Sequence, residues 1–271
     1  MCATEVAALL RAPAKRAAGA VPEPAATEQT ADTSQQVAAT SAVPSTAVTA
    51  APRGVPAHSP TPRAALPSRD AIDALPPFDA LPLARIQVPQ TREQFAQAVE
   101  QLLAERYIGF DTESKPTFAR GEAATGPHVV QFAKRDAAWL FQVHNAASRD
   151  ALAAVLASGS TVKVGFGLRS DRGHIRARLG TPLHTVLDLT TWFRRQGYRN
   201  EVGVKTAVAM VLQQRFVKSK RWSTSNWAAA QLSEGQCVYA ANDAYGALAV
   251  LHALLAQGHR EADLPIIEQD A

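Results

Sequence analysis

Two apolar segments separated by a short charged turn constrain the fold of this chain most strongly. Residues 129–133 and 139–143 are rich in Val, Phe, Trp and Leu, and the stretch KRDA lies between them. A connection this short joins antiparallel neighbours, because a parallel crossover needs a dozen residues or more. The sequence therefore predicts a hairpin, which excludes a purely parallel sheet.

Strand and helix patterns alternate on both sides of this hairpin. We expect strands at residues 84–88, 106–111, 161–166 and 185–187, and helices at residues 91–104, 148–156, 171–179, 188–195, 204–212 and 233–256. Thr91 and Ser233 begin capping-box patterns, and Ser148 is the expected cap of its helix. This order predicts an α/β domain whose mixed sheet is flanked by helices, and the hairpin favours a ribonuclease-H-like sheet over a Rossmann fold.

The first 80 residues have a different composition. They contain 11 of the 17 prolines and 23 alanines, and Phe78 is their single aromatic residue. Such a segment cannot bury enough apolar surface to offset its chain entropy. We therefore expect a disordered tail at residues 1–80, a folded domain at residues 81–260 and a short C-terminal tail at residues 261–271.

Charge and cysteine content narrow the possible partners and the compartment. Residues 81–271 carry 22 Lys and Arg against 17 Asp and Glu, so the folded part is mildly basic and permits a nucleic-acid partner. No apolar run reaches the length of a membrane-spanning helix, so we expect no membrane partner. Cys2 and Cys237 lie far apart in the sequence, which fits a reducing cytoplasm better than a disulfide framework. The oligomeric state has no sequence signal.

Acidic residues occur at two places where the surroundings are apolar. In the stretch GFDTESKP, Asp111 and Glu113 lie two apart at the end of a strand, so both side chains point to the same face. Tyr239 and Asp243 lie four apart in the last long helix and share one helical face. Each pair alone also fits a solvated surface position.

A third acidic residue follows a glycine-rich strand exit. In KVGFGLRSD, Asp171 fits a helix N-cap or a metal ligand, and the two roles can coexist. Four carboxylates gathered in one cleft would repel one another without cations, and oxygen ligands of this kind suit hard divalent ions. Two such ions can activate a water and stabilise the leaving oxygen in phosphodiester hydrolysis. The pattern therefore predicts a metal-dependent hydrolytic site.

These segments resemble the three motifs of the DEDDy family of 3′–5′ exonucleases, which includes ribonuclease D and the Werner syndrome exonuclease domain. GFDTESKPTF resembles the first motif, KVGFGLRSD the second and YAANDAYGALAVLHAL the third, and residues 218–245 resemble the approach to the third. The likeness covers roughly residues 84–257. Ribonuclease D tends to carry Asn or His shortly before the second-motif Asp, whereas residues 167–170 are closer to the Werner-type pattern.

The resemblance implies a role for each matching residue. Asp111 would bridge two divalent cations, Mg²⁺ or Mn²⁺, and Glu113 and Asp243 would hold the ion that carries the attacking water. Asp171 would help to hold the second ion, and Tyr239 would orient the water. The implied activity is removal of nucleoside monophosphates from a free 3′ end of nucleic acid, with DNA favoured over RNA.

Substrate-binding candidates lie beside the motifs. They are Thr112, Lys115, Phe118, Arg169 and Lys218. The cations suit phosphate contacts, which position a strand without reading its sequence, but solvated surface charge fits equally. An aromatic side chain at position 118 suits stacking on a terminal base or packing within a loop. Asp188 follows a strand and is expected to cap a helix rather than to bind metal.

Three alternatives stay open at this point. The domain can be a ribonuclease that trims RNA 3′ ends. It can be a nucleic-acid-binding domain that kept the fold without catalysis, although all five motif residues are present. In the third alternative, the N-terminal segment recruits or tethers a partner and catalysis is secondary.

Overall fold

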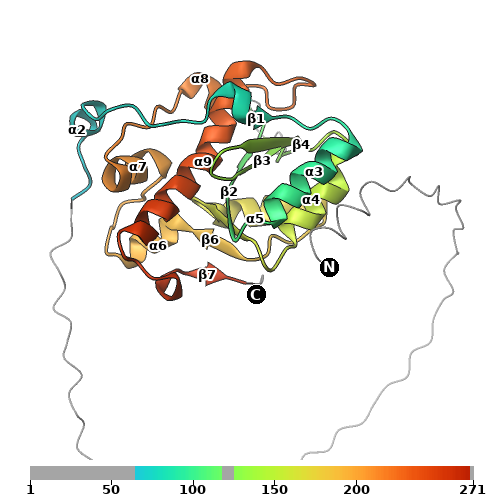
Figure 1. Ribbon diagram of the computed structural model, residues 1–271. Coiled ribbons are helices and arrows are strands. Elements are labelled where there is room, and N and C mark those ends of the chain that lie inside the picture. The colour runs from blue at the N-terminus through green and yellow to red at the C-terminus, as the bar shows by residue number, and fades with distance from the viewer. Residues whose placement is uncertain (1–64, 118–124, 269–271) are drawn as a thin grey trace, which may run out of the picture. The chain divides into compact units, whose positions relative to one another are not determined.

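The computed structural model describes residues 65–117 and 125–268. Its centre is one seven-stranded sheet (Figure 1). The strands lie in the order β1 (Ile86–Gln87), β4 (Ala138–Gln142), β3 (Val129–Ala133), β2 (Tyr107–Glu113), β5 (Val162–Gly165), β6 (Val186–Asp188) and β7 (Ile266–Ile267). The strand that carries the first acidic pair is therefore in the middle of the sheet.

The pairing of the strands confirms the predicted hairpin and the mixed sheet. Strand β3 pairs antiparallel with both β2 and β4, whereas β5 pairs parallel with β2 and β6. At the two edges, β1 pairs parallel with β4 and β7 pairs antiparallel with β6. Because β2 lies between an antiparallel and a parallel neighbour, its backbone is held on both sides.

Helices cover both faces of the sheet. On one face, α3 (Arg92–Leu103), α4 (Ser148–Leu156) and α5 (Leu168–Leu179) share an apolar core with β2. On the other face lie α7 (Val204–Leu212) and the long helix α9 (Glu234–Ala256) (Figure 1). Shorter elements complete the described fold: α2 (Arg69–Asp73), η1 (Leu83–Arg85), α6 (Leu189–Arg195), α8 (Lys220–Ser223) and η2 (Glu261–Asp263).

Alternation along β2 decides what each of its side chains meets. Ile108 and Phe110 are fully buried in the core shared with α3, α4 and α5. Gly109 faces the other side, where a Cβ atom on it would lie 2.0 Å from the carbonyl oxygen of Ala244 in α9. The backbones of strand and helix therefore touch at Gly109, which brings the following strand residues beside the third motif.

Of the caps predicted at Thr91, Ser148 and Ser233, two are confirmed and one is wrong. Thr91 and Ser233 form complete capping boxes at the starts of α3 and α9. Ser148 is not an N-cap: Ala147 has that position, and the Ser148 hydroxyl donates to the carbonyl of Asn145 at 2.7 Å. The buried hydroxyl thus fastens the turn that precedes α4 instead of accepting from the helix.

Helix α5 begins earlier than predicted, at Leu168 rather than Asp171. Its N-cap is Gly167, which has a φ of 68°, a conformation that favours glycine. Asp171 therefore lies in the first turn, and its expected role as the cap is wrong. The predicted strand at residues 84–88 is also shorter, because residues 83–85 form the 3₁₀ turn η1.

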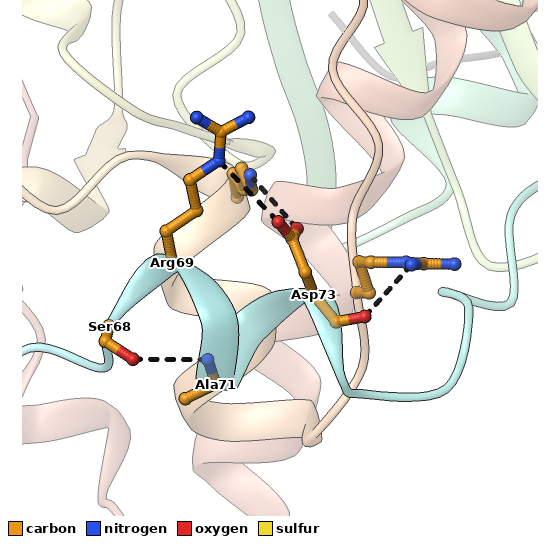
Figure 2. Close-up of polar contacts among 6 residues, drawn as sticks. Ser68, Arg69, Ala71 and Asp73 are labelled. Atoms are coloured by element: carbon orange, nitrogen blue, oxygen red, sulfur yellow. Dashed lines mark hydrogen bonds and ion pairs between the residues drawn. The ribbon is translucent and has the colours of Figure 1, made fainter.

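The folded domain extends beyond both predicted boundaries. Residues 65–80 belong to the expected tail, yet α2 and the segment after it lie against α7 and α9, and we call residues 65–82 the N-terminal strap. Asp73 forms ion pairs with Arg69 and Lys205, and its carbonyl accepts from Arg215 at 3.0 Å (Figure 2). At the other end, β7 lies within the expected C-terminal tail. Residues 1–64 lie outside the described residues.

In the part of the chain that the structure describes, no helix combines the length and the apolar character needed to span a membrane.

Candidate active site

Three carboxylates meet where β2 ends beneath α9. Asp111 and Glu113 occupy alternate positions of β2, and Asp243 comes from the third turn of α9. One carboxylate oxygen from each lies within 4.8 Å of the others. The period-two geometry of the strand and the close approach at Gly109 bring the three together.

The electrostatics of this cluster suit a cation. Burial and the neighbouring carboxylate of Asp243 raise the pKa of Asp111 to about 8. Burial and the carboxylate of Asp111 raise the pKa of Glu113 to about 9. Asp243 is buried, and its Oδ1 has no hydrogen-bond partner among the described residues. Three oxygen donors with one side left open match the way proteins hold Mg²⁺, so the residues present fit a divalent metal site.

Lys218 reaches into the cluster from the segment between α7 and α8. Its Nζ lies 2.8 Å from Asp243 Oδ2 and 5.6 Å from the centre of the Tyr239 ring. Burial lowers the pKa of Lys218, but the carboxylates of Asp243 and Asp111 more than offset this and raise it above its ordinary value. The lysine is therefore charged and neutralises part of the acidic cluster.

Tyr239 lies one helical turn before Asp243, as its spacing predicts. Its side chain is buried, with the ring centre 6.0 Å from that of Trp227. Burial and the nearby Asp243 carboxylate raise the pKa of the phenol. Tyr239 therefore keeps its proton at neutral pH and can donate a hydrogen bond at the edge of the cluster.

Asp171 does not join the three-carboxylate cluster among the described residues. Instead, the hydroxyl of Thr112 donates a hydrogen bond to Asp171 Oδ1, and the Thr112 N–H donates to Asp111 Oδ1 at 2.9 Å. Thr112 lies between the two acidic residues of β2 and points to the opposite face. It therefore links Asp171 on α5 to the strand that carries Asp111.

Asp188 caps two helices at once. Its Oδ1 accepts from the N–H groups of Gly167 and Thr190, and its Oδ2 accepts from the N–H of Leu168. The predicted cap of α6 is thus confirmed, and the same carboxylate satisfies the start of α5. The end of β6 thereby sets where the first turn of α5, with Asp171, begins.

A family model described as 3′–5′ exonuclease matches residues 86–258. The chain belongs to the 3′–5′ exonuclease family. This confirms the resemblance drawn from the three motifs and the hydrolase class expected from it. The segments that carry the acidic cluster all lie within the matched range.

Individual proteins agree with this assignment. The mouse bifunctional 3′–5′ exonuclease/ATP-dependent helicase WRN is 26% identical over 149 residues, which cover 54% of this chain and 11% of that protein. The likeness therefore spans only a small part of that relative.

Solved structures share the fold. The EXO domain of Aedes aegypti Nibbler superposes with a TM-score of 0.57 at 22% identity, covering 65% of this chain and 90% of that one. Trypanosoma brucei RNase D, in its complex with RNA U12, gives a TM-score of 0.56 at 21% identity, covering 71% of this chain and 66% of that one. The ribonuclease-H-like sheet predicted from the sequence is thereby confirmed.

Two of the remaining substrate-binding candidates, Lys115 and Arg169, lie within the described residues. The backbone N–H of Lys115 donates to His128 Nδ1 at 3.1 Å just beyond β2. Arg169 is exposed and lines a hollow of about 220 Å³ beside Asp188, and it is not among the residues that line the pocket of Asp111 and Asp243. Phe118 lies outside the described residues.

Two further residues lie beside the acidic cluster and have no sequence signal. Glu201, in the segment before α7, lines a pocket of about 210 Å³ together with Asp111, Lys218 and Asp243, and we call this the carboxylate pocket. Gln131 pairs with Asp111 across the β2–β3 ladder and is fully buried, with no hydrogen-bond partner for its amide among the described residues. Their positions follow from loop placement and strand register, which only the fold provides.

Proposed function

We propose that this exonuclease domain hydrolyses phosphodiester bonds from a free 3′ end of nucleic acid and releases nucleoside monophosphates, with two divalent cations, Mg²⁺ or Mn²⁺, as cofactors. The observation that carries the proposal is the convergence of Asp111, Glu113 and Asp243 from a central strand and a crossing helix. Like charges this close need cations, and the donor set is one that hard divalent ions prefer.

Each residue has a separate task in this reaction. Asp111, Glu113 and Asp243 would hold the ions, and Asp171, oriented by Thr112, would support them from the second motif. When bound, the ions supply a water of lowered pKa and stabilise the charge on the leaving oxygen. Tyr239 keeps its phenolic proton and donates a hydrogen bond that orients the attacking water.

DNA is the first substrate we propose, and RNA the second. The second motif, with Gly167 and no Asn or His before Asp171, follows the Werner-type pattern and supports DNA. The structural likeness to RNase D in complex with RNA U12 supports RNA trimming as the alternative. Both substrates present the same phosphodiester to the carboxylates, so the choice depends on contacts to the sugar.

The test uses single-stranded DNA and RNA of matched sequence, labelled at the 5′ end, with Mg²⁺, Mn²⁺ or EDTA. We expect a metal-dependent ladder that shortens from the 3′ end, and the ladder shows the preferred sugar. Asp111→Asn should abolish it, whereas Asp136→Asn, an exposed carboxylate in the β3–β4 turn, should not change it. Intact binding without shortening of either substrate would contradict the proposal and leave a non-catalytic nucleic-acid-binding domain.

A further inference from the structure

A second concave surface lies beside the carboxylate pocket. It has a volume of about 390 Å³ and runs between the N-terminal strap and α9. We call it the strap groove, and the side chains that matter here are Phe78, Phe216, Val217, Trp222, Val238 and Tyr239. Its size falls in the range of natural ligand sites, and the proposed mechanism leaves it without a role.

The strap is fastened to the helix that carries the catalytic candidates. Asn242 Oδ1 accepts from the N–H of Leu81 at 2.8 Å, and its Nδ2 donates to the carbonyl of Leu81 at 3.2 Å. Phe78 packs against Phe216 and Tyr245, with ring centres 5.2 and 5.7 Å apart. The strap is therefore a fixed wall of the groove. Asn242, which holds it, directly precedes Asp243 in α9.

The opposite wall of the groove presents a flat aromatic ring. Trp222 is half-buried and lies against Gly235, where a Cβ atom would come within 2.1 Å of the indole. The guanidinium of Arg221 lies 4.7 Å from the centre of the indole ring. Val217 is 74% exposed at the rim of the groove. This wall brings an aromatic ring and a positive charge together.

The strap groove and the carboxylate pocket are neighbours that share one segment. Val217 and Ser219 line the groove, whereas Lys218 between them lines the carboxylate pocket. Tyr239 lines the groove while its ring lies under the Lys218 ammonium. A strand whose terminal phosphodiester lies at the carboxylates would thus meet the groove on the far side of Lys218.

We propose that the strap groove binds an unpaired nucleobase of the substrate strand, from the part that precedes the scissile bond. Bases stack on aromatic side chains whatever their identity, and adjacent cations attract the phosphates between them. The groove offers both within reach of Tyr239. This inference rests on the proposed exonuclease function and makes its substrate single-stranded near the 3′ end.

Binding can be measured without hydrolysis. Trp139, Trp192 and Trp227 are buried, so Trp222 is the tryptophan that an added base can reach. In EDTA, a short oligothymidylate should quench the tryptophan fluorescence of the full chain. Trp222→Phe should remove the quenching. Trp222→Leu should raise the dissociation constant about tenfold in an anisotropy titration. Ile267→Ser, an exposed apolar position on β7, should bind as the wild type does.

A pair of charged variants covers the case in which Trp222→Leu disturbs α8. Val238 lies at the groove on α9 and is 36% exposed, so either charge can reach water. Val238→Glu should bind the oligonucleotide several-fold more weakly than Val238→Lys, because only the carboxylate repels the strand. Equal affinity of the two variants, or wild-type affinity of Trp222→Leu, would overturn the proposal.

Hydrolysis of a one-base substrate separates this inference from the proposed function. The p-nitrophenyl ester of thymidine 5′-monophosphate, or of its uridine counterpart, carries no base before the scissile bond. Trp222→Leu should hydrolyse the ester as fast as the wild type but lose kcat/KM on oligonucleotides. An equal loss on both substrates would overturn the groove assignment. If the wild-type chain hydrolyses neither substrate, the proposed function fails, and the quenching result still decides the groove.

Discussion

The Nζ of Lys218 lies 2.8 Å from Oδ2 of Asp243, inside the carboxylate cluster that fits a divalent ion. The side chain of Asp243 is buried, whereas that of Lys218 is 39% exposed to solvent. The lysine thus supplies positive charge to the carboxylates in the metal-free protein. A divalent ion that binds Asp243 must compete with it or share the carboxylate.

Replacing Lys218 by Met should have opposite effects on the free protein and on metal binding. In EDTA, urea unfolding should show a loss of roughly 1–2 kcal/mol, less than for a fully buried pair because Lys218 is partly solvated. Calorimetric titration should show tighter Mn²⁺ binding, since the competing ammonium is gone. Lys220→Met, an exposed neighbour, is the control, and weaker Mn²⁺ binding in Lys218→Met would contradict the prediction.

The stability of the metal-free protein should fall as the pH rises. Asp111 and Glu113 have folded-state pKa values of about 8 and 9, well above their ordinary values of 3.8 and 4.5. Between these limits the folded state holds protons that the unfolded state has released, so deprotonation favours unfolding. Urea unfolding in EDTA from pH 5 to 9 should show this decline, Mg²⁺ should oppose it, and Asp111→Asn should reduce it. A flat profile in EDTA would count against the prediction.

Gly109→Ala should damage the site more than the fold. The added methyl group would meet the carbonyl of Ala244 at 2.0 Å, so β2 and α9 must move apart. Overpacking of this kind costs about 1–3 kcal/mol, and it also separates Asp111 from Asp243. We expect weaker metal binding in calorimetry and a large loss of exonuclease rate. Gly173→Ala is the matched control: its Cβ meets nothing within 4 Å, so it should gain about 0.5–1 kcal/mol.

Lys163 should make the free energy of unfolding depend on pH in the opposite direction. Its side chain is fully buried, Nζ donates to the carbonyls of Ser158 and Thr161 at 2.7 and 3.0 Å, and burial lowers its pKa to about 7. Between about pH 7 and the ordinary value of 10.5, the unfolded state holds a proton that the folded state lacks. The unfolding free energy of the wild type should therefore rise relative to Lys163→Met across this range. A difference in unfolding free energy between the two proteins that stays constant with pH would disprove this prediction.

Local patterns predicted the elements that local contacts build. The hairpin, the capping boxes at Thr91 and Ser233, and the shared face of Tyr239 and Asp243 depend on residues a few positions apart. For the same reason, the shared face of Asp111 and Glu113 could be anticipated from their strand spacing. None of these local features depends on a partner that is distant in the sequence, whereas the meeting of β2 with Asp243 on α9 does.

The features that the sequence did not predict depend on distant partners. The start of α5 is set by Asp188, which lies 20 residues beyond Leu168. Strand β7 has two residues and owes its position to β6. The composition of the N-terminal strap is that of an Ala/Pro-rich tail. In the structure, Asn242 holds the backbone of Leu81 at the end of the strap, although the two residues are 161 positions apart. Composition predicts disorder there because it does not include the surface that the rest of the fold provides.

The contact of Gly109 with Ala244 also sets an order of events for a chain leaving the ribosome. Strand β2 is made early, but its carboxylates gain Asp243 only after α9, the last long helix described, has emerged and docked. A ligand that binds only the folded state stabilises only that state. A divalent ion held by all three carboxylates would therefore stabilise finished copies of the domain and not nascent or truncated ones.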